Sequence, residues 1–131
     1  MNRTRISRLE RIARAQEAVA ESAARSHARA IAEHEASREG AAEIVASLNT
    51  DNPLHGLLTD LMAGALTRNA EETHRLKQAA ERAGTDRQVE SVRAEALRRR
   101  ADAAAHTLRR DRARRELEDL VSRPARPVPG R

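Results

Sequence analysis

The feature that most constrains the fold is a proline-free stretch, residues 5–48, in which apolar or small side chains recur at alternating spacings of three and four residues. This spacing aligns them along one face of an α-helix, as in a heptad seam. Polar residues fill the remaining seam positions without changing the period. The pattern predicts a helix over about residues 4–48. The apolar or small seam residues are Ile6, Leu9, Ala13, Ala20, Ala23, Ala30, Ala41, Ile44 and Leu48, and the polar ones are Gln16, His27, His34 and Ser37.

A turn signal at residues 49–53 ends this helix. Asn52 can cap a new helix with Pro53 at its first position, where the missing N–H has no cost. The densest apolar cluster of the chain follows, so a short amphipathic helical segment is expected near the tip, at about 49–68. Two interpretations of this segment remain open. It either closes the end of a hairpin by packing against residues 44–48, or it docks a partner.

A second long helical pattern, Ala-rich and charged, covers about residues 69–122. Gly84-Thr85-Asp86 is its weak point, because Thr85 and Gln88 could form a capping box and kink or restart the helix. The Pro/Arg tail, 123–131, is expected to be disordered or extended. The seam runs through Leu76, Ala80, Ala83, Ala94, Leu97, Ala101, Ala104 and Leu108, is interrupted by Arg87 and Glu90, and later shifts to Ala113, Leu117 and Leu120.

Composition argues against a compact globule. The chain of 131 residues has no aromatic side chain, and 27 of its apolar residues are Ala. Two long helices of similar length are therefore expected to bury their narrow seams on each other. The predicted fold is all-α, a long antiparallel coiled-coil hairpin forming a single domain over residues 1–123. The alternative is one bent helix that dimerises.

Few side chains offer chemistry. The absence of Cys removes disulfides, thiolate nucleophiles and Cys-ligated zinc. His27 and His34 stand about 10 Å apart along a helix, too far to share one metal ion within a single chain. No metalloprotease motif, phosphate loop or nucleophile elbow occurs. We expect neither enzyme activity nor a cofactor, and no membrane span, because uncharged stretches are far shorter than the roughly 20 residues a spanning helix needs.

The excess positive charge lies at the C-terminal end. Residues 1–92 carry 13 basic and 14 acidic groups, whereas residues 93–131 carry 12 Arg and six acids. Three interpretations remain open: a solvated helix surface, an acidic protein partner, or nucleic acid. Nucleic acid is the least favoured, because the chain has no aromatic side chain to stack on a base. Only sequence-independent phosphate contacts would be available to it.

The layout resembles the FliJ/YscO group, the coiled-coil stalk of flagellar and related type III export systems. The resemblance comprises the chain length, an N-terminal helix that contains RxxRLERIARAQE, a mid-chain break, and a C-terminal helix that reads VESVRAEALRRRADAAAHTLRRDRARRELEDLV. It implies a non-catalytic, monomeric antiparallel hairpin similar to the central shaft of rotary ATPases, with a dimer as the alternative. It also implies a cytoplasmic protein held peripherally at the inner membrane through the export apparatus.

The implied partners are the export ATPase ring, the export gate and export chaperones. We expect the paired termini, residues 3–20 and 98–120, to enter the ring. We expect aliphatic residues near the tip to make the gate contact, because this chain lacks the aromatic residues that other family members have. A self-associating structural adaptor and a sequence-independent nucleic-acid binder are the alternatives. The expected ring contacts are Arg98, Arg99, Arg100, Arg109 and Arg110, and the expected gate contacts are Leu57, Leu58, Leu61 and Met62.

Overall fold

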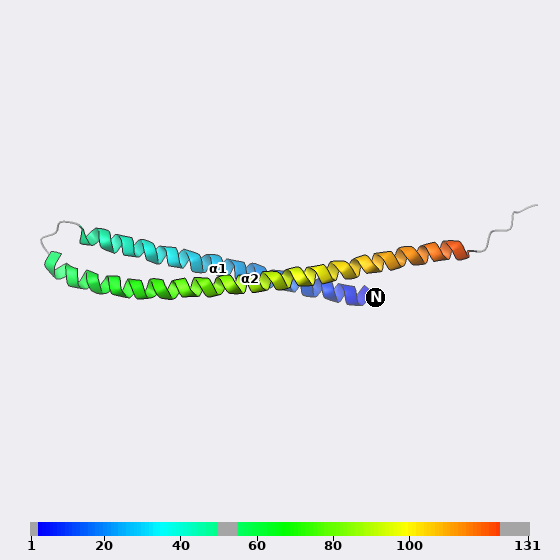
Figure 1. Ribbon diagram of the computed structural model, residues 1–131, viewed down its shortest axis with the longest axis horizontal. Coiled ribbons are helices and arrows are strands. Elements are labelled where there is room, and N and C mark those ends of the chain that lie inside the picture. Colours follow the sequence, from blue (N-terminus) through cyan, green and yellow to red (C-terminus); the bar gives the residue numbers. More distant parts are fainter. Residues whose placement is uncertain (1–2, 50–54, 124–131) are drawn as a thin grey trace, which may run out of the picture. The chain divides into compact units, whose positions relative to one another are not determined.

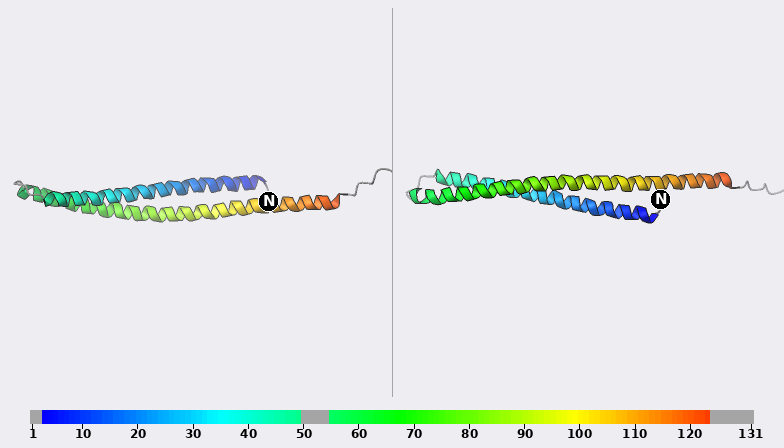
Figure 2. Two further views of the ribbon diagram at one scale, coloured as in Figure 1. Left: turned by 90° about the horizontal axis from the view of Figure 1, so that it is seen from above. Right: turned by 60° about the horizontal axis from the view of Figure 1, so that its bottom comes forward.

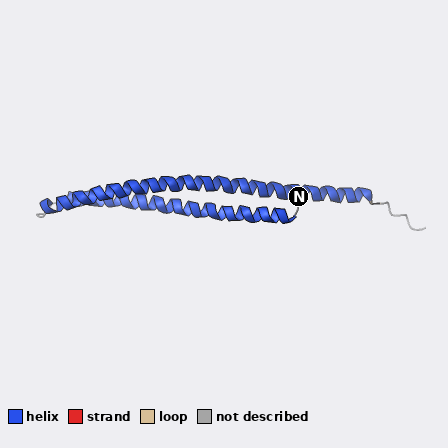
Figure 3. Cartoon of the chain, turned by 90° about the horizontal axis from the view of Figure 1, so that it is seen from below, coloured by secondary structure: helices blue, strands red, loops and turns tan. Residues whose placement is uncertain are grey.

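The computed structural model describes residues 3–49 and 55–123, except for the side chains of residues 55–58. Helix α1 spans Arg3–Leu48 and helix α2 spans His55–Ser122 (Figure 1). The described residues contain no strand (Figure 3). At 1.5 Å per residue, the 46 residues of α1 measure about 69 Å and the 68 residues of α2 about 100 Å. The all-α class is thus confirmed.

The chain divides into two compact units, each made from one stretch of α1 and one stretch of α2. Unit 1 consists of Met1–Gln16 and Arg93–Arg131, and unit 2 of Glu17–Val92. In each unit the two helical stretches lie side by side (Figure 2). In unit 2, residues later in α1 contact residues earlier in α2, so the two helices are antiparallel. This pairing is consistent with a helical hairpin.

The covered face of α1 is the one that the sequence pattern predicts. Every seam position from Ile6 to Leu48 is partly or fully covered, polar members included. On α2 the same alternating spacing of covered residues runs from Met62 to Asp111, with Arg87 as its one exposed position. The helix faces follow directly from the heptad period, because neighbours at three and four residues share one side of a helix. Interlocking of the side chains as in a coiled coil stays a prediction.

Three contacts set the register of unit 2. The hydroxyl oxygens of Ser37 and Thr73 lie 2.6 Å apart. The Asn69 side-chain amide donates to the backbone carbonyl of Ser37 at 3.2 Å. Further along, the His27 ring lies against Gly84. The two residue numbers of the Ser37–Thr73 and His27–Gly84 pairs add to 110 and 111, so the helices keep one antiparallel register between these contacts.

Glycine at position 84 allows a close approach and does not break the helix. A Cβ at this position would meet His27 Nε2 at 3.1 Å, closer than an ordinary van der Waals contact. The capping box and helix restart that the sequence allows at this point do not occur, since α2 continues through the region. The Thr85 hydroxyl donates to the Glu81 carbonyl at 3.2 Å, the i−4 bond of a residue inside a helix.

The expected division between a tip segment and a second helix is also wrong. Helix α2 begins at His55, so the apolar cluster expected as a separate segment forms the first turns of α2. The residues named as its cap and first turn, Asn52 and Pro53, lie outside the described residues, as does the tail from residue 124. The structure joins the two expected segments in one helix, because helix-compatible residues connect them without a break.

The buried core of the described residues is small and made entirely of alanine. Its four members all belong to unit 1, where one lies on α1 and three lie on α2. Alanine lets the helix backbones approach closely but removes little apolar surface from water, about 0.8 kcal/mol per buried methylene-sized group. Pairing therefore also depends on half-buried Leu and Ile side chains and on polar contacts. The buried residues are Ala13, Ala94, Ala101 and Ala104.

Candidate functional site

The five arginines expected to contact a ring partner fall into two groups. Arg98 lies beside α1, where its Nη1 donates to Glu10 Oε1 at 2.8 Å and lies 3.9 Å from Asp102 Oδ1. About a third of each side chain of the Arg98–Glu10 pair is accessible. Arg98 thus connects the two helices of unit 1.

The Glu10 carboxylate is held by two arginines. The hydrogen bond from Arg98 lowers the pKa of Glu10 below its ordinary value. Desolvation opposes this shift, and the positive charges of Arg98 and Arg14 reinforce it. Arg14 Nε lies 3.6 Å from the same carboxylate oxygen. The local arrangement follows from the sequence, since Glu10 and Arg14 are one helical turn apart.

The other four arginines are exposed on α2. With a rotation of about 100° per residue, Arg99 and Arg110 lie opposite the covered seam, and Arg100 and Arg109 lie on its two flanks. Arg99 has 80% of its side chain accessible and pairs with Glu95 of its own helix at 3.5 Å. We call these four residues the outer arginines: Arg99, Arg100, Arg109 and Arg110.

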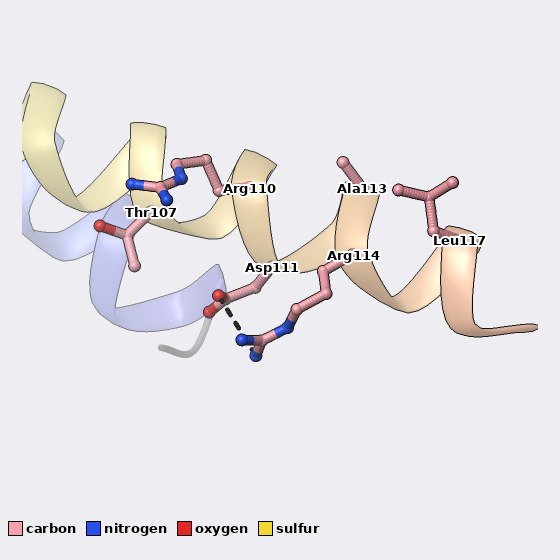
Figure 4. A pocket seen from close by; sticks show the side chains of 6 residues that line it. All are labelled: Thr107, Arg110, Asp111, Ala113, Arg114 and Leu117. Carbon is pink, nitrogen blue, oxygen red and sulfur yellow. Dashed lines mark ion pairs between the residues drawn. The ribbon is translucent and has the colours of Figure 1, made fainter.

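A hollow of about 570 Å³ lies on α2 beside the outer arginines. Figure 4 shows Ala113 and Leu117 as neighbours on one side of the helix, with Arg114 reaching toward Asp111. Arg114 lies 3.8 Å from Asp111 and 3.9 Å from Glu118, so it forms ion pairs along its own helix. Six residues line the hollow: Thr107, Arg110, Asp111, Ala113, Arg114 and Leu117.

The residues expected to contact the gate differ in accessibility. Leu61 is 69% exposed, and Met62 is half-buried in the seam of α2. Leu57 and Leu58 belong to the first turns of α2, but their side chains lie outside the described residues. Of the two whose side chains are described, Leu61 is therefore the exposed apolar contact.

Two polar seam residues of α1, His27 and His34, lie close to residues of α2. His27 packs on Gly84, with Nδ1 3.5 Å from Arg87 Nη1. His34 lines a groove of about 420 Å³ on unit 2 together with Arg38, His74 and Lys77. In the described part of the chain, no three His, Asp or Glu side chains are grouped so that they could hold a metal ion.

No helix within residues 3–49 or 55–123 combines the length and the apolar character needed to cross a bilayer.

Sequence reasoning missed that Arg98 is held by Glu10, because the two residues are far apart in the chain. It also missed that the last apolar residues of α2 are uncovered. A change in the phase of the seam near Ala113 was the signal that could have revealed this.

Comparisons with known proteins give no relative, since no protein-family model, curated protein or solved structure matches the chain.

Proposed function

We propose that this chain is a non-catalytic component of a flagellar or type III protein export apparatus. In this proposal it engages the ring of the export ATPase through unit 1 and the export gate through the start of α2, with export chaperones as further partners. It acts at the cytoplasmic face of the inner membrane. The sequence resemblance motivates the proposal, and the pairing of two long helices is compatible with it.

The observation that carries the ring contact is the accessibility of the outer arginines. All four side chains are exposed. Arg99 and Arg110 lie opposite the side of α2 that α1 covers, and Arg100 and Arg109 lie on the two flanks of that side. A partner with acidic groups could approach them without separating the two helices. Charge of this kind speeds encounter and fixes orientation more than it sets affinity. Arg98 has a different role in this proposal, because it holds α1 and α2 together through Glu10.

The test is stimulation of a purified export ATPase by the purified chain. We expect stimulation by the natural chain and its loss when all four outer arginines are changed to Glu. The matched control changes four exposed arginines of unit 2 to Glu, namely Arg25, Arg29, Arg68 and Arg82. Equal stimulation by both variants would remove the outer arginines from the proposal. Failure of the natural chain to stimulate any export ATPase would remove the function itself.

The gate contact is tested separately at the start of α2. Leu57→Asp combined with Leu61→Asp should abolish capture of the chain by the cytoplasmic part of an export gate, because it puts charges into an apolar contact. Val92→Asp is the control, since Val92 is a similarly exposed apolar residue elsewhere on α2. Gate capture that persists in the double variant, with helicity unchanged by circular dichroism, would exclude this contact.

The outer arginines also support a second candidate, sequence-independent binding of nucleic acid. Neutralising phosphates would make such binding fall steeply with rising salt. In a gel-shift assay, retardation of arbitrary duplex DNA that is lost at moderate salt and in the outer-arginine variant would favour this alternative.

A further inference from the structure

The last three turns of α2 expose apolar side chains that no helix of the described chain covers. The covered seam of α2 ends at Asp111, and every residue from Arg112 to Arg123 is exposed. Leu117 and Leu120 are each 63% exposed, and Val121 is 84% exposed. Large aliphatic side chains at such accessibility on one short stretch of helix are typical of an interaction surface.

These residues form a strip with the spacing of a helix-packing surface. Ala113, Leu117 and Leu120 follow one another at four and three residues, which aligns them on one side of α2. At about 100° per residue, this side is opposite the seam that faces α1. The α1 helix therefore cannot cover the strip in the present pairing. We call Ala113, Leu117, Leu120 and Val121 the C-terminal strip.

Basic side chains border the C-terminal strip. Arg110 continues it toward the N-terminus, Arg109 lies on one edge, and Arg114 lies on the other. Glu116 is the one acidic residue on these edges between positions 109 and 121, while Asp111 and Glu118 lie on the seam side and pair with Arg114. A helix that packs on the strip would therefore meet mainly positive charge along its flanks.

Charge disfavours a second copy of this chain as the occupant. Two copies of α2 can be aligned antiparallel so that Ala113 of each copy faces Leu117 of the other. Along the edges of this contact, Arg114 then lies beside Arg114 of the other copy, and Glu116 lies beside Glu116 of the other copy. In a parallel alignment Arg109 faces Arg114. Both alignments set like charges against each other across the contact, which suppresses pairing.

We propose that the C-terminal strip docks an amphipathic helix of another protein whose apolar face is flanked by acidic side chains. The leucines enter the apolar face of that helix, and Arg109, Arg110 and Arg114 meet its carboxylates. This is the helix-on-helix mode of recognition, read through anchors at i, i+4 and i+7. The proposal does not depend on the export function, because it uses only the exposure, spacing and charge of the strip.

The probe is a synthetic peptide of three heptads, with Leu at alternating spacings of three and four residues and Glu on both flanks. Its matched partner carries Lys in place of Glu. Fluorescence anisotropy of each labelled peptide is measured with the full chain at low and moderate salt. We expect the Glu peptide to bind at least tenfold more tightly than the Lys peptide. Equal affinity for the two peptides would overturn the proposal.

Two sets of variants locate the contact. Leu117→Asp with Leu120→Asp should weaken binding of the Glu peptide at least tenfold, whereas Val89→Asp with Val92→Asp should leave it unchanged. Changing Arg109, Arg110 and Arg114 to Glu should transfer the preference to the Lys peptide. Binding that survives the leucine changes, or a preference that survives the arginine changes, would exclude the strip.

The two proposals fail in different experiments. Changing Arg99 and Arg100 to Glu should leave peptide binding intact while lowering ATPase stimulation, and the leucine changes should abolish peptide binding even if the chain stimulates no ATPase. Sedimentation equilibrium tests the alternative occupant of the strip, a second copy of this chain. If the natural chain is a dimer that becomes a monomer on Leu117→Asp with Leu120→Asp, the strip binds a second copy and the proposal is wrong.

Discussion

At the scale of single residues, the contact with the clearest electrostatic consequence joins Glu10 of α1 to Arg98 of α2. The two residues are far apart in the chain, and their 2.8 Å hydrogen bond ties the first turns of α1 to α2. Arg14 adds a second positive charge from the same helix. Exposed ion pairs contribute little to stability. The charge-assisted hydrogen bond, however, is the stronger kind and also fixes the geometry of the contact.

This pair predicts a specific pH dependence. A carboxyl group whose pKa is lower in the folded state stabilises that state when ionised, and this contribution is lost as the pH falls through the lowered pKa. The free energy of unfolding of the natural chain should therefore exceed that of Glu10→Gln at pH 6. The difference should shrink as the pH falls below about 4.3, the ordinary pKa of Glu.

Chemical denaturation between pH 3 and pH 6 measures this difference. Glu21→Gln, a change at an exposed position of α1, is the control and should show a smaller effect. A difference for Glu10→Gln that stays constant over this range would contradict the role of the Glu10–Arg98 bond.

At the scale of the helices, polar groups determine which residues face each other. The Ser37 and Thr73 hydroxyls and the Asn69 amide form a connected group across the seam, and the Thr73 hydroxyl also donates to the side-chain oxygen Oδ1 of Asn69 at 3.4 Å. Alanine seams fit at more than one register, since neighbouring alanines offer similar surfaces. Shifting the helices by one heptad would separate these partners, so polar seam groups can specify register.

The register can be tested by cross-linking, because the chain contains no Cys. Ser37→Cys with Thr73→Cys should form an intramolecular disulfide on mild oxidation, since the natural side-chain oxygens are only 2.6 Å apart. Ser37→Cys with Ala80→Cys, one heptad or about 10.5 Å away, should not. Non-reducing electrophoresis and mass spectrometry distinguish the two. Equal cross-linking of both pairs would mean that the helices slide.

At the scale of the whole molecule, the amount of surface left in water is the dominant property. The chain exposes 10602 Å², whereas a globular protein of its mass of 14.5 kDa would expose roughly 6,900 Å². Against an unfolded chain of roughly 21,000 Å², it buries only about three quarters of the area that a globular protein buries. Because the buried side chains among the described residues are all alanine, apolar burial is limited further.

Limited burial predicts a small heat-capacity change on unfolding. Globular proteins show about 12–15 cal/mol/K per residue, and this value follows the apolar area that unfolding exposes. We expect less than about 10 cal/mol/K per residue for this chain, measured by scanning calorimetry over a range of pH. A heat-capacity change typical of globular proteins, measured at low protein concentration, would show that the chain buries far more apolar surface than the described contacts provide.

Much of the fold could be predicted from local pattern. The class, the α1 boundaries within one residue and the covered face of each helix follow from the 3,4 spacing, because helical geometry converts spacing into a shared face. The start of α2 and its continuity at Gly84 could not be predicted in this way. Glycine and turn signals act within a few residues, whereas packing against His27 involves a residue that is distant in the chain.

The sequence by itself determined that two long helices form, which side of each is covered, and that the positive charge gathers near the C-terminal end. Only the tertiary structure decided which side chains are paired and which are exposed. It brought Glu10 to Arg98 and left the outer arginines and the C-terminal strip uncovered. The physical reason is that helical period is a local property. Register depends instead on which distant side chains meet.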